Sequence, residues 1–104
     1  MKYEGAYNFS EGLAAVKFNG KWGFIDSKGK EAIPFGYEGA KYFEGGYAAA
    51  KQNGNWGVIN KENKTILAFM YDDIVWIKDD ANDIRVKKGN KYFHVDRQGN
   101  ELKK

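Results

Sequence analysis

Two stretches of this chain of 104 residues are nearly identical: NGKWGFID at 19–26 and NGNWGVIN at 53–60, which lie 34 positions apart. A sequence that repeats at a fixed interval of roughly 20 to 50 residues builds one structural unit several times over. This repetition constrains the fold more strongly than any feature of the composition. Tyrosines recur at the same interval, and each is followed by an acidic residue: Tyr3-Glu4, Tyr37-Glu38 and Tyr71-Asp72.

The repetition divides the chain into three units, 3–36, 37–70 and 71–104. The third unit carries two extra residues in the polar stretch KDDAND (78–83), where we expect a longer loop. The units use up the sequence, so we expect a single repeat domain, 1–104.

Each unit predicts a β-hairpin. In the first unit, LAAVKF (13–18) and KWGFID (21–26) flank Asn19-Gly20. Asn-Gly between apolar segments is typical of a type I′ turn, because both central residues need a positive φ. Asn53-Gly54 repeats the signal, and Gly89-Asn90 in the third unit suits the related type II′ turn. A third strand, EAIPF at 31–35, contains a proline, which indicates an edge or a strand end.

A two-residue turn fixes which residues face each other across the hairpin. It places Lys17 opposite Trp22, and by the same count Lys51 opposite Trp56 and Lys87 opposite Tyr92. The second strand of the hairpin is apolar on both faces, so we expect it to be central and covered on two sides.

A glycine follows each of the two tryptophans of the hairpins, as Gly23 and Gly57, whereas Phe93 stands at that place in the third unit. A glycine inside a strand marks the close approach of another group. We expect Gly23 and Gly57 to accept a large side chain from a neighbouring unit. Phe93 would fill its own gap, because a terminal repeat has no successor.

The predicted fold is all-β: three antiparallel β-hairpin repeats of about 34 residues. They either stack into an open array or close into a compact barrel with pseudo-threefold symmetry. An open array leaves edge strands that invite self-association, so a homo-oligomer formed through β-edges is one expectation.

These residues resemble the WG-repeat family, also called the KWG-repeat family. The resemblance rests on GLAAVKFNGKWGFIDSKGKEAIP (12–34) and GYAAAKQNGNWGVINKENKTIL (46–67), and more weakly on 83–102, which has lost the Trp and the Gly of the signature. The signature positions are Trp22, Gly23, Trp56, Gly57, Tyr92 and Phe93. The resemblance implies a non-catalytic interaction repeat, found mostly in bacterial proteins.

Little in the sequence indicates catalysis. There is no cysteine, and His94 is the single histidine, with Asp96 two residues on as a conceivable partner. A lone histidine at a packing position without a nucleophile nearby favours a structural role. The acids Asp72, Asp73, Asp79, Asp80 and Asp83 lack the glycine-centred pattern of a calcium loop. We therefore expect no enzyme, no metal site and no cofactor.

Two sets of residues are candidates for binding. Aromatic side chains at positions that vary between units suit a protein contact, since Tyr and Trp are enriched at binding hot spots; these are Tyr7, Tyr42, Tyr47 and Trp76. The second set is the recurring Lys17, Lys51 and Lys87, which could hold phosphate, although covering the ring opposite is the favoured interpretation.

The net charge of +3 comes from 17 basic and 14 acidic side chains that are interspersed along the chain, as on an ordinary solvated surface. We expect a cytoplasmic protein-binding module that does not enter a membrane. A small inhibitor or immunity-type protein is a special case of this. A repeat that binds glycans or nucleic acid is the less favoured alternative, because sugars and bases also stack on aromatic rings.

Overall fold

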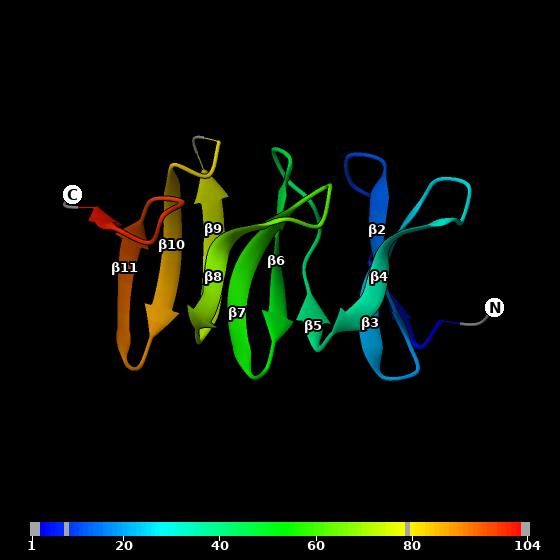
Figure 1. Cartoon of the computed structure of the whole chain (residues 1–104), viewed down its shortest axis with the longest axis horizontal. Helices are drawn as coiled ribbons and strands as arrows, with labels where there is room; N and C mark the ends of the chain where they lie inside the picture. The colour runs from blue at the N-terminus through cyan, green and yellow to red at the C-terminus, as the bar shows by residue number, and fades with distance from the viewer. Residues whose placement is uncertain (1–2, 8, 79, 103–104) are drawn as a thin grey trace.

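The computed structural model describes residues 3–7, 9–78 and 80–102, which form three four-stranded antiparallel sheets (Figure 1). The first sheet consists of β1 (Gly5–Ala6), β2 (Leu13–Phe18), β3 (Lys21–Asp26) and β4 (Glu31–Tyr37). The second consists of β5 (Gly39–Ala40), β6 (Tyr47–Gln52), β7 (Asn55–Asn60) and β8 (Thr65–Tyr71). The third consists of β9 (Asp73–Lys78), β10 (Asp83–Lys88), β11 (Lys91–Val95) and β12 (Glu101–Leu102).

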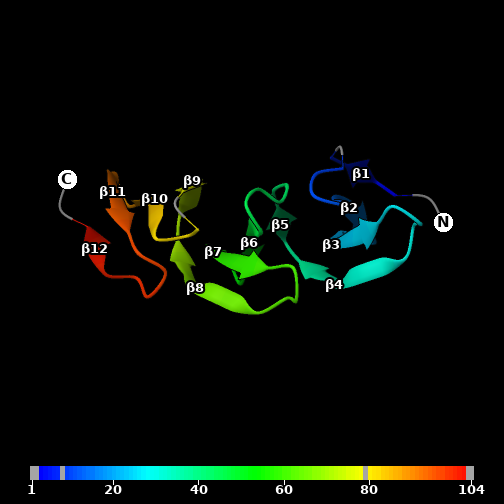
Figure 2. The same cartoon turned by 90° about the horizontal axis from the view of Figure 1, so that it is seen from above.

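The three sheets match the three repeats and stand in an open row 45 Å long and 24 × 19 Å across. The all-β prediction is confirmed, and of its two packing alternatives the open array is correct, because the sheets do not close on one another. Viewed from above, β1, β5 and β9 follow one long side of the row, and β4, β8 and β12 follow the other (Figure 2).

The hairpin turns have the predicted geometry. Asn19 and Gly20 have φ values of 53° and 79°, and Asn53 and Gly54 have 53° and 82°, as a type I′ turn requires. The predicted register is confirmed in all three units, with Lys17 facing Trp22, Lys51 facing Trp56 and Lys87 facing Tyr92. Within each sheet β3, β7 and β11 are interior strands, as expected, and β4 with its proline is an edge strand.

The recurring acid after each tyrosine holds the hairpin turn of its own unit. Glu4 accepts a hydrogen bond of 3.0 Å from the backbone N–H of Gly20. The equivalent bonds join Glu38 to Gly54 at 2.9 Å and Asp72 to Gly89 at 2.7 Å.

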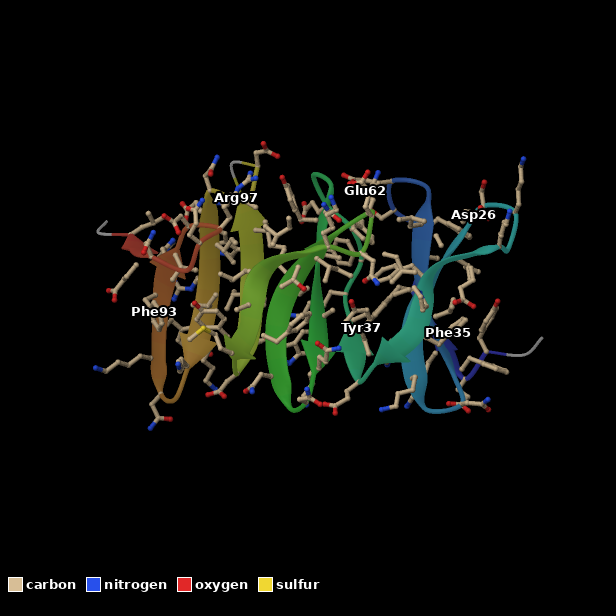
Figure 3. The ribbon with its side chains drawn as sticks, viewed as in Figure 1. Asp26, Phe35, Tyr37, Glu62, Phe93 and Arg97 are labelled. Atoms are coloured by element: carbon tan, nitrogen blue, oxygen red, sulfur yellow. The ribbon has the colours of Figure 1, made fainter. Side chains whose placement is uncertain are left out.

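A second set of turns lies at the opposite end of the strands, where Figure 3 labels Asp26, Glu62 and Arg97. Oδ1 of Asp26 accepts hydrogen bonds of 2.9 Å from the N–H groups of Lys28 and Lys30. The bond from Lys30 lowers the pKa of the Asp26 carboxyl, although desolvation opposes the shift. Asn60 and Asp96 make the same pair of bonds in their units.

The explanation predicted for the strand glycines is wrong in one respect. A Cβ on Gly23 would lie 2.6 Å from the carbonyl oxygen of Ile33 and 3.0 Å from the backbone nitrogen of Phe35. Both belong to β4 of the same unit, so backbone from the same sheet, rather than a side chain from a neighbouring unit, makes the close approach. The strand bulges there, because Trp22 pairs with Tyr37 while Phe24 already pairs with Ile33.

The second unit repeats this arrangement, with the carbonyl oxygen of Leu67 at 2.6 Å from a Cβ on Gly57. In the third unit β12 (Glu101–Leu102) pairs with His94 and Val95. Phe93 stands at the position of the glycine, and its ring packs edge-on against Tyr71.

The rings of Trp22 and Trp56 each cover a glycine on the first strand of their own sheet. A Cβ on Gly5 would meet Cη2 of Trp22 at 3.4 Å, and one on Gly39 would meet Cη2 of Trp56 at 3.1 Å. The third unit has Asp73 at this place, opposite Lys87, and the smaller Tyr92 replaces the tryptophan.

The hydrophobic core lies mainly between the sheets. Between the first and second sheets, the fully buried rings of Phe24 and Phe43 meet at 4.7 Å. Between the second and third sheets, Val58 and Leu67 pack against Ile84 and Val86. Among the described residues there is no helix long and apolar enough to cross a membrane.

Candidate functional site

The four aromatic residues predicted for binding lie on or beside the first strands of the sheets or on the strand that follows. Tyr7 follows β1, Tyr42 follows β5, Tyr47 begins β6 and Trp76 lies in β9. Because β1, β5 and β9 share one long side of the row (Figure 2), the fold brings residues from all three units to that side.

A groove on this side separates the second and third sheets. Tyr42, Tyr47 and Ala49 line it from the second unit, and Ile74 and Val75 from the third. Three of the four predicted aromatic residues contribute to it, since Trp76 lines its edge as well. The indole ring of Trp76 packs edge-on against His94, with the ring centroids 5.0 Å apart.

A second hollow continues from Tyr42 toward the first unit and is lined by Tyr7, Phe9, Ser10 and Tyr42. Tyr42 is common to both hollows and is 53% exposed. The two hollows therefore form one continuous surface across the three sheets. We call it the aromatic side and define it by Tyr7, Phe9, Tyr42, Tyr47 and Trp76.

Besides Trp76, which packs against His94, two of these rings are held by contacts within the chain. Tyr7 stacks on Trp22 with the ring centroids 5.4 Å apart. The hydroxyl of Tyr47 donates a hydrogen bond of 3.0 Å to Asp80 and accepts one of 3.3 Å from Arg97. Arg97 also donates to the backbone carbonyl of Asp80, so Tyr47 forms part of a polar link between the second and third units. Tyr42 and Phe9, each 53% exposed, are consequently the rings most available to a partner.

The three recurring lysines lie on the hairpins, cross-strand from Trp22, Trp56 and Tyr92. Lys87 places its ammonium 5.8 Å from the centre of the Tyr92 ring, a distance at which a cation–π attraction operates. Over Trp56 the ammonium is that of Lys41, at 5.3 Å, and the same group forms an ion pair of 3.0 Å with Asp73. Lys41 thus links the second and third units beside the groove.

Asp96 was the partner considered for His94 from the sequence, and this pairing is wrong. Nδ1 of His94 lies 2.8 Å from Oδ1 of Asp83 on the neighbouring strand. An ionised carboxylate only accepts hydrogen bonds, so with Asp83 ionised this contact requires the proton of the ring on Nδ1. Asp96 instead holds the turn at Gln98 and Asn100, and those bonds lower its pKa.

The acids considered for a cation serve other purposes where they are described. Asp72 holds a hairpin turn, Asp73 pairs with Lys41, Asp80 binds Tyr47 and Asp83 binds His94. Asp79 lies outside the described residues. Within the described ranges no three acidic or histidine side chains are grouped as a metal site would require.

Three residues of interest escaped sequence reasoning. Phe9 repeats the position of Phe43, so its periodicity indicated scaffold packing, yet it is exposed. Lys41 and Glu11 stand at positions where the units differ, which gave no pattern to interpret. Oε2 and Oε1 of Glu11 accept hydrogen bonds of 2.5 and 2.8 Å from the N–H groups of Gly45 and Gly46 and so join the first two units.

No curated protein and no solved structure matches this chain. One protein family does, described as "WG containing repeat", and it matches three times in succession, over residues 1–22, 22–56 and 56–92. The matches meet at Trp22 and Trp56, and together they cover most of the sequence. The chain belongs to the WG-containing repeat family.

Proposed function

We propose that this chain is a non-enzymatic protein-binding module and that the aromatic side is its contact surface. The observation that carries the proposal is the position of Tyr42. Its ring is half exposed, belongs to both hollows and stands on the middle sheet, between two inter-sheet cores that hold the backbone in place.

The shape of the surface favours a macromolecule over a small ligand. The groove between the second and third sheets offers about 110 Å³, less than the roughly 300–1,000 Å³ of a typical small-molecule site. The second hollow is larger, about 380 Å³, but only four residues line it, so it cannot surround a ligand. Shallow aromatic surfaces of this kind suit the centre of a protein interface.

The charges beside the groove favour protein over nucleic acid. Lys41 is paired with Asp73, and Arg97 lies 3.5 Å from a carboxylate oxygen of Asp80. A nucleic-acid site requires cations that release counterions from phosphates, and here the cations already have acidic neighbours. A small inhibitor that blocks one target protein is a specific form of the same proposal.

Site-specific photo-crosslinking in the native cell tests the proposal. A benzophenone amino acid at Tyr42 should capture one protein, whereas the same probe at Lys28, in an exposed turn at the end of the strands, should not. Products that nuclease treatment removes, and binding that falls steeply with salt, would support the nucleic-acid alternative instead. Equal capture from both positions would contradict a specific surface.

Self-association through sheet edges is a second proposal, supported by the lengths of the edge strands. β4 and β8 have seven residues and β9 has six, whereas β1 and β5 have two. Long edge strands can pair with another chain. Sedimentation over a range of concentrations tests this, with Val75→Pro, an exposed position in β9, as the variant expected to weaken any dimer formed through that edge.

A further inference from the structure

Both inter-sheet interfaces join the same two kinds of sheet face. We call the face that a sheet turns toward the preceding sheet its leading face, and the opposite one its trailing face. The second sheet's leading face includes Ala40, Phe43, Ala48, Ala50 and Ile59. The first sheet's trailing face, which packs against it, consists of Leu13, Ala15, Phe24 and Ile33. The second interface repeats this apolar pairing between Ala49, Val58 and Leu67 and the third sheet's Ile74, Ile84, Val86 and Val95.

The trailing face of the third sheet differs in chemistry from the other two. The cross-strand pair Ala15–Phe24 of the first sheet becomes Ala49–Val58 in the second and Arg85–His94 in the third. Asp83 adds a carboxylate that binds His94 at 2.8 Å. A polar outer face is what the terminal unit of a repeat array needs for solubility. This end of the row is chemically capped.

The leading face of the first sheet keeps the apolar pattern of the internal faces. Ala14, Val16 and Ile25 repeat Ala48, Ala50 and Ile59. One half of this face is covered from within the unit, because the rings of Tyr3 and Phe35 stack at 6.1 Å over it. Figure 3 shows Phe35 on this outer flank of the first sheet. Tyr37, which is the counterpart of Tyr3 in the second unit, lies between the first and second sheets.

The other half of the first leading face is open. Phe43, which packs on Phe24 of the preceding sheet, is 0% exposed, whereas the equivalent Phe9 is 53% exposed. Ala40 is buried, whereas the equivalent Ala6 is exposed. Ala6 and Phe9 therefore occupy positions that are buried between sheets in the second unit, but no neighbouring sheet covers them here.

We propose that the leading face of the first sheet is a docking site for the trailing face of another WG-repeat sheet, with Ala6 and Phe9 as the contact residues. Its occupant is a sheet that presents a Leu-Ala-Phe-Ile or Ala-Val-Leu set, as the two internal trailing faces do. A second copy of this chain cannot supply that set. The apolar trailing faces of its first two sheets are already packed within the chain, and the trailing face of its third sheet carries Asp83, Arg85 and His94. The two end faces of the row therefore differ, since that of the first sheet exposes Ala6 and Phe9 and that of the third carries Arg85 and His94.

A chain with residues 37–70 duplicated directly ahead of Tyr3 tests the proposal. The junction keeps the repeat phase, since Met70 is followed by a tyrosine in the native sequence too. Hydrogen exchange of the amides of segment 3–9 should slow by at least about tenfold in the extended chain. Phe9→Ala should lower the Tm of the extended chain by roughly 10 °C or more, and that of the original chain far less.

The matched control is the same duplicate carrying Tyr47→Asp, Ala49→Arg and Val58→His, which are the residues of the capped third sheet. This duplicate should leave exchange of segment 3–9 unchanged. Equal protection by both duplicates, or protection by neither, would overturn the proposal.

A second experiment does not depend on the duplicate folding. Asp83→Leu, Arg85→Ala and His94→Phe together give the third sheet the trailing face of the first. This variant should associate head to tail in sedimentation, and adding Ala6→Glu should restore the monomer. A variant that stays monomeric, or association that Ala6→Glu leaves intact, contradicts the docking face. A symmetrical dimer of the unmodified chain that Ala6→Glu breaks would assign the face to a second copy and would also overturn the proposal.

Discussion

The α-carbon of Gly23 lies so close to the carbonyl oxygen of Ile33 that a Cβ would stand 2.6 Å from it. Real Cβ atoms do not approach an oxygen so closely, so a side chain at this position requires the backbone of β4 to move. The WG dipeptide of this chain therefore combines two needs: a tryptophan that covers the first strand and a glycine that lets the fourth strand bulge over the third.

Gly23→Ala should destabilise the protein by about 1–3 kcal/mol or more, as overpacking does where rigid backbone must shift. The Tm should fall by roughly 4–8 °C for each kcal/mol in a domain of this size. Gly36→Ala is the control, because a Cβ there meets nothing within 4 Å. A thermal melt in which the two variants behave alike would contradict the close approach.

The register of the hairpins could be predicted from sequence because a two-residue Asn-Gly turn allows only one pairing of the two strands. The partner of Gly23 could not be predicted, because the bulge in β4 depends on three residues, 34–36, lying between the two paired positions. No local pattern distinguishes such a bulge from a regular strand. The choice between an open row and a closed one likewise depends on contacts between units. The repeat pattern does not reveal how neighbouring units are oriented relative to each other.

Glu11 should contribute stability that depends on pH. Burial raises the pKa of its carboxyl, but the N–H groups of Gly46 and Gly45 and the ammonium of Lys61 outweigh this and lower it. A carboxyl whose pKa is depressed by folding stabilises the protein above its unfolded pKa and loses that effect as pH falls through the folded value. Glu11→Gln should therefore cost about 1 kcal/mol or less at pH 7, since solvent screens the site, and nothing once the carboxyl is protonated.

Thermal melts of the two proteins between neutral and strongly acidic pH measure this difference. Glu31→Gln is the control, because it removes the same charge from an exposed residue of β4. Its effect on the Tm should not involve the bonds that Glu11 makes to the second unit. A Glu11→Gln penalty that stays constant down to the lowest pH would show that charge is not responsible.

Tyr42 and Tyr47 should respond differently to loss of the hydroxyl. Tyr47→Phe removes the bonds to Asp80 and Arg97 and should cost about 1 kcal/mol of unfolding free energy. Tyr42→Phe should cost nothing measurable, because the ring is half exposed. Urea denaturation of both variants checks this, and a larger loss for Tyr42 than for Tyr47 would mean that Tyr42 belongs to the scaffold.

The candidate site was predicted in part. Variation between the units marked Tyr7, Tyr42, Tyr47 and Trp76, and the structure brings three of these to one groove and joins the fourth through Tyr42. Phe9 was missed for a physical reason: the equivalent Phe43 is fully buried against the preceding sheet, whereas Phe9 lacks that cover and is 53% exposed. A repeat pattern describes the average unit, so it cannot reveal which copy lacks its neighbour.

His94→Ala should destabilise the third sheet because it leaves the carboxylate of Asp83, which is 9% exposed, without the imidazole that lies 2.8 Å from it. Breaking a buried pair on one side costs about 3–5 kcal/mol, and the partial exposure of His94 places this case toward the lower end or below it. Adding Asp83→Ala should return part of the loss, and the double-mutant cycle measures the coupling of the two side chains. The control is Asp96→Asn, which should be nearly neutral, because Asn60 makes the same turn bonds in the second unit. A loss from His94→Ala no larger than that from Asp96→Asn would contradict a stabilising pair between His94 and Asp83.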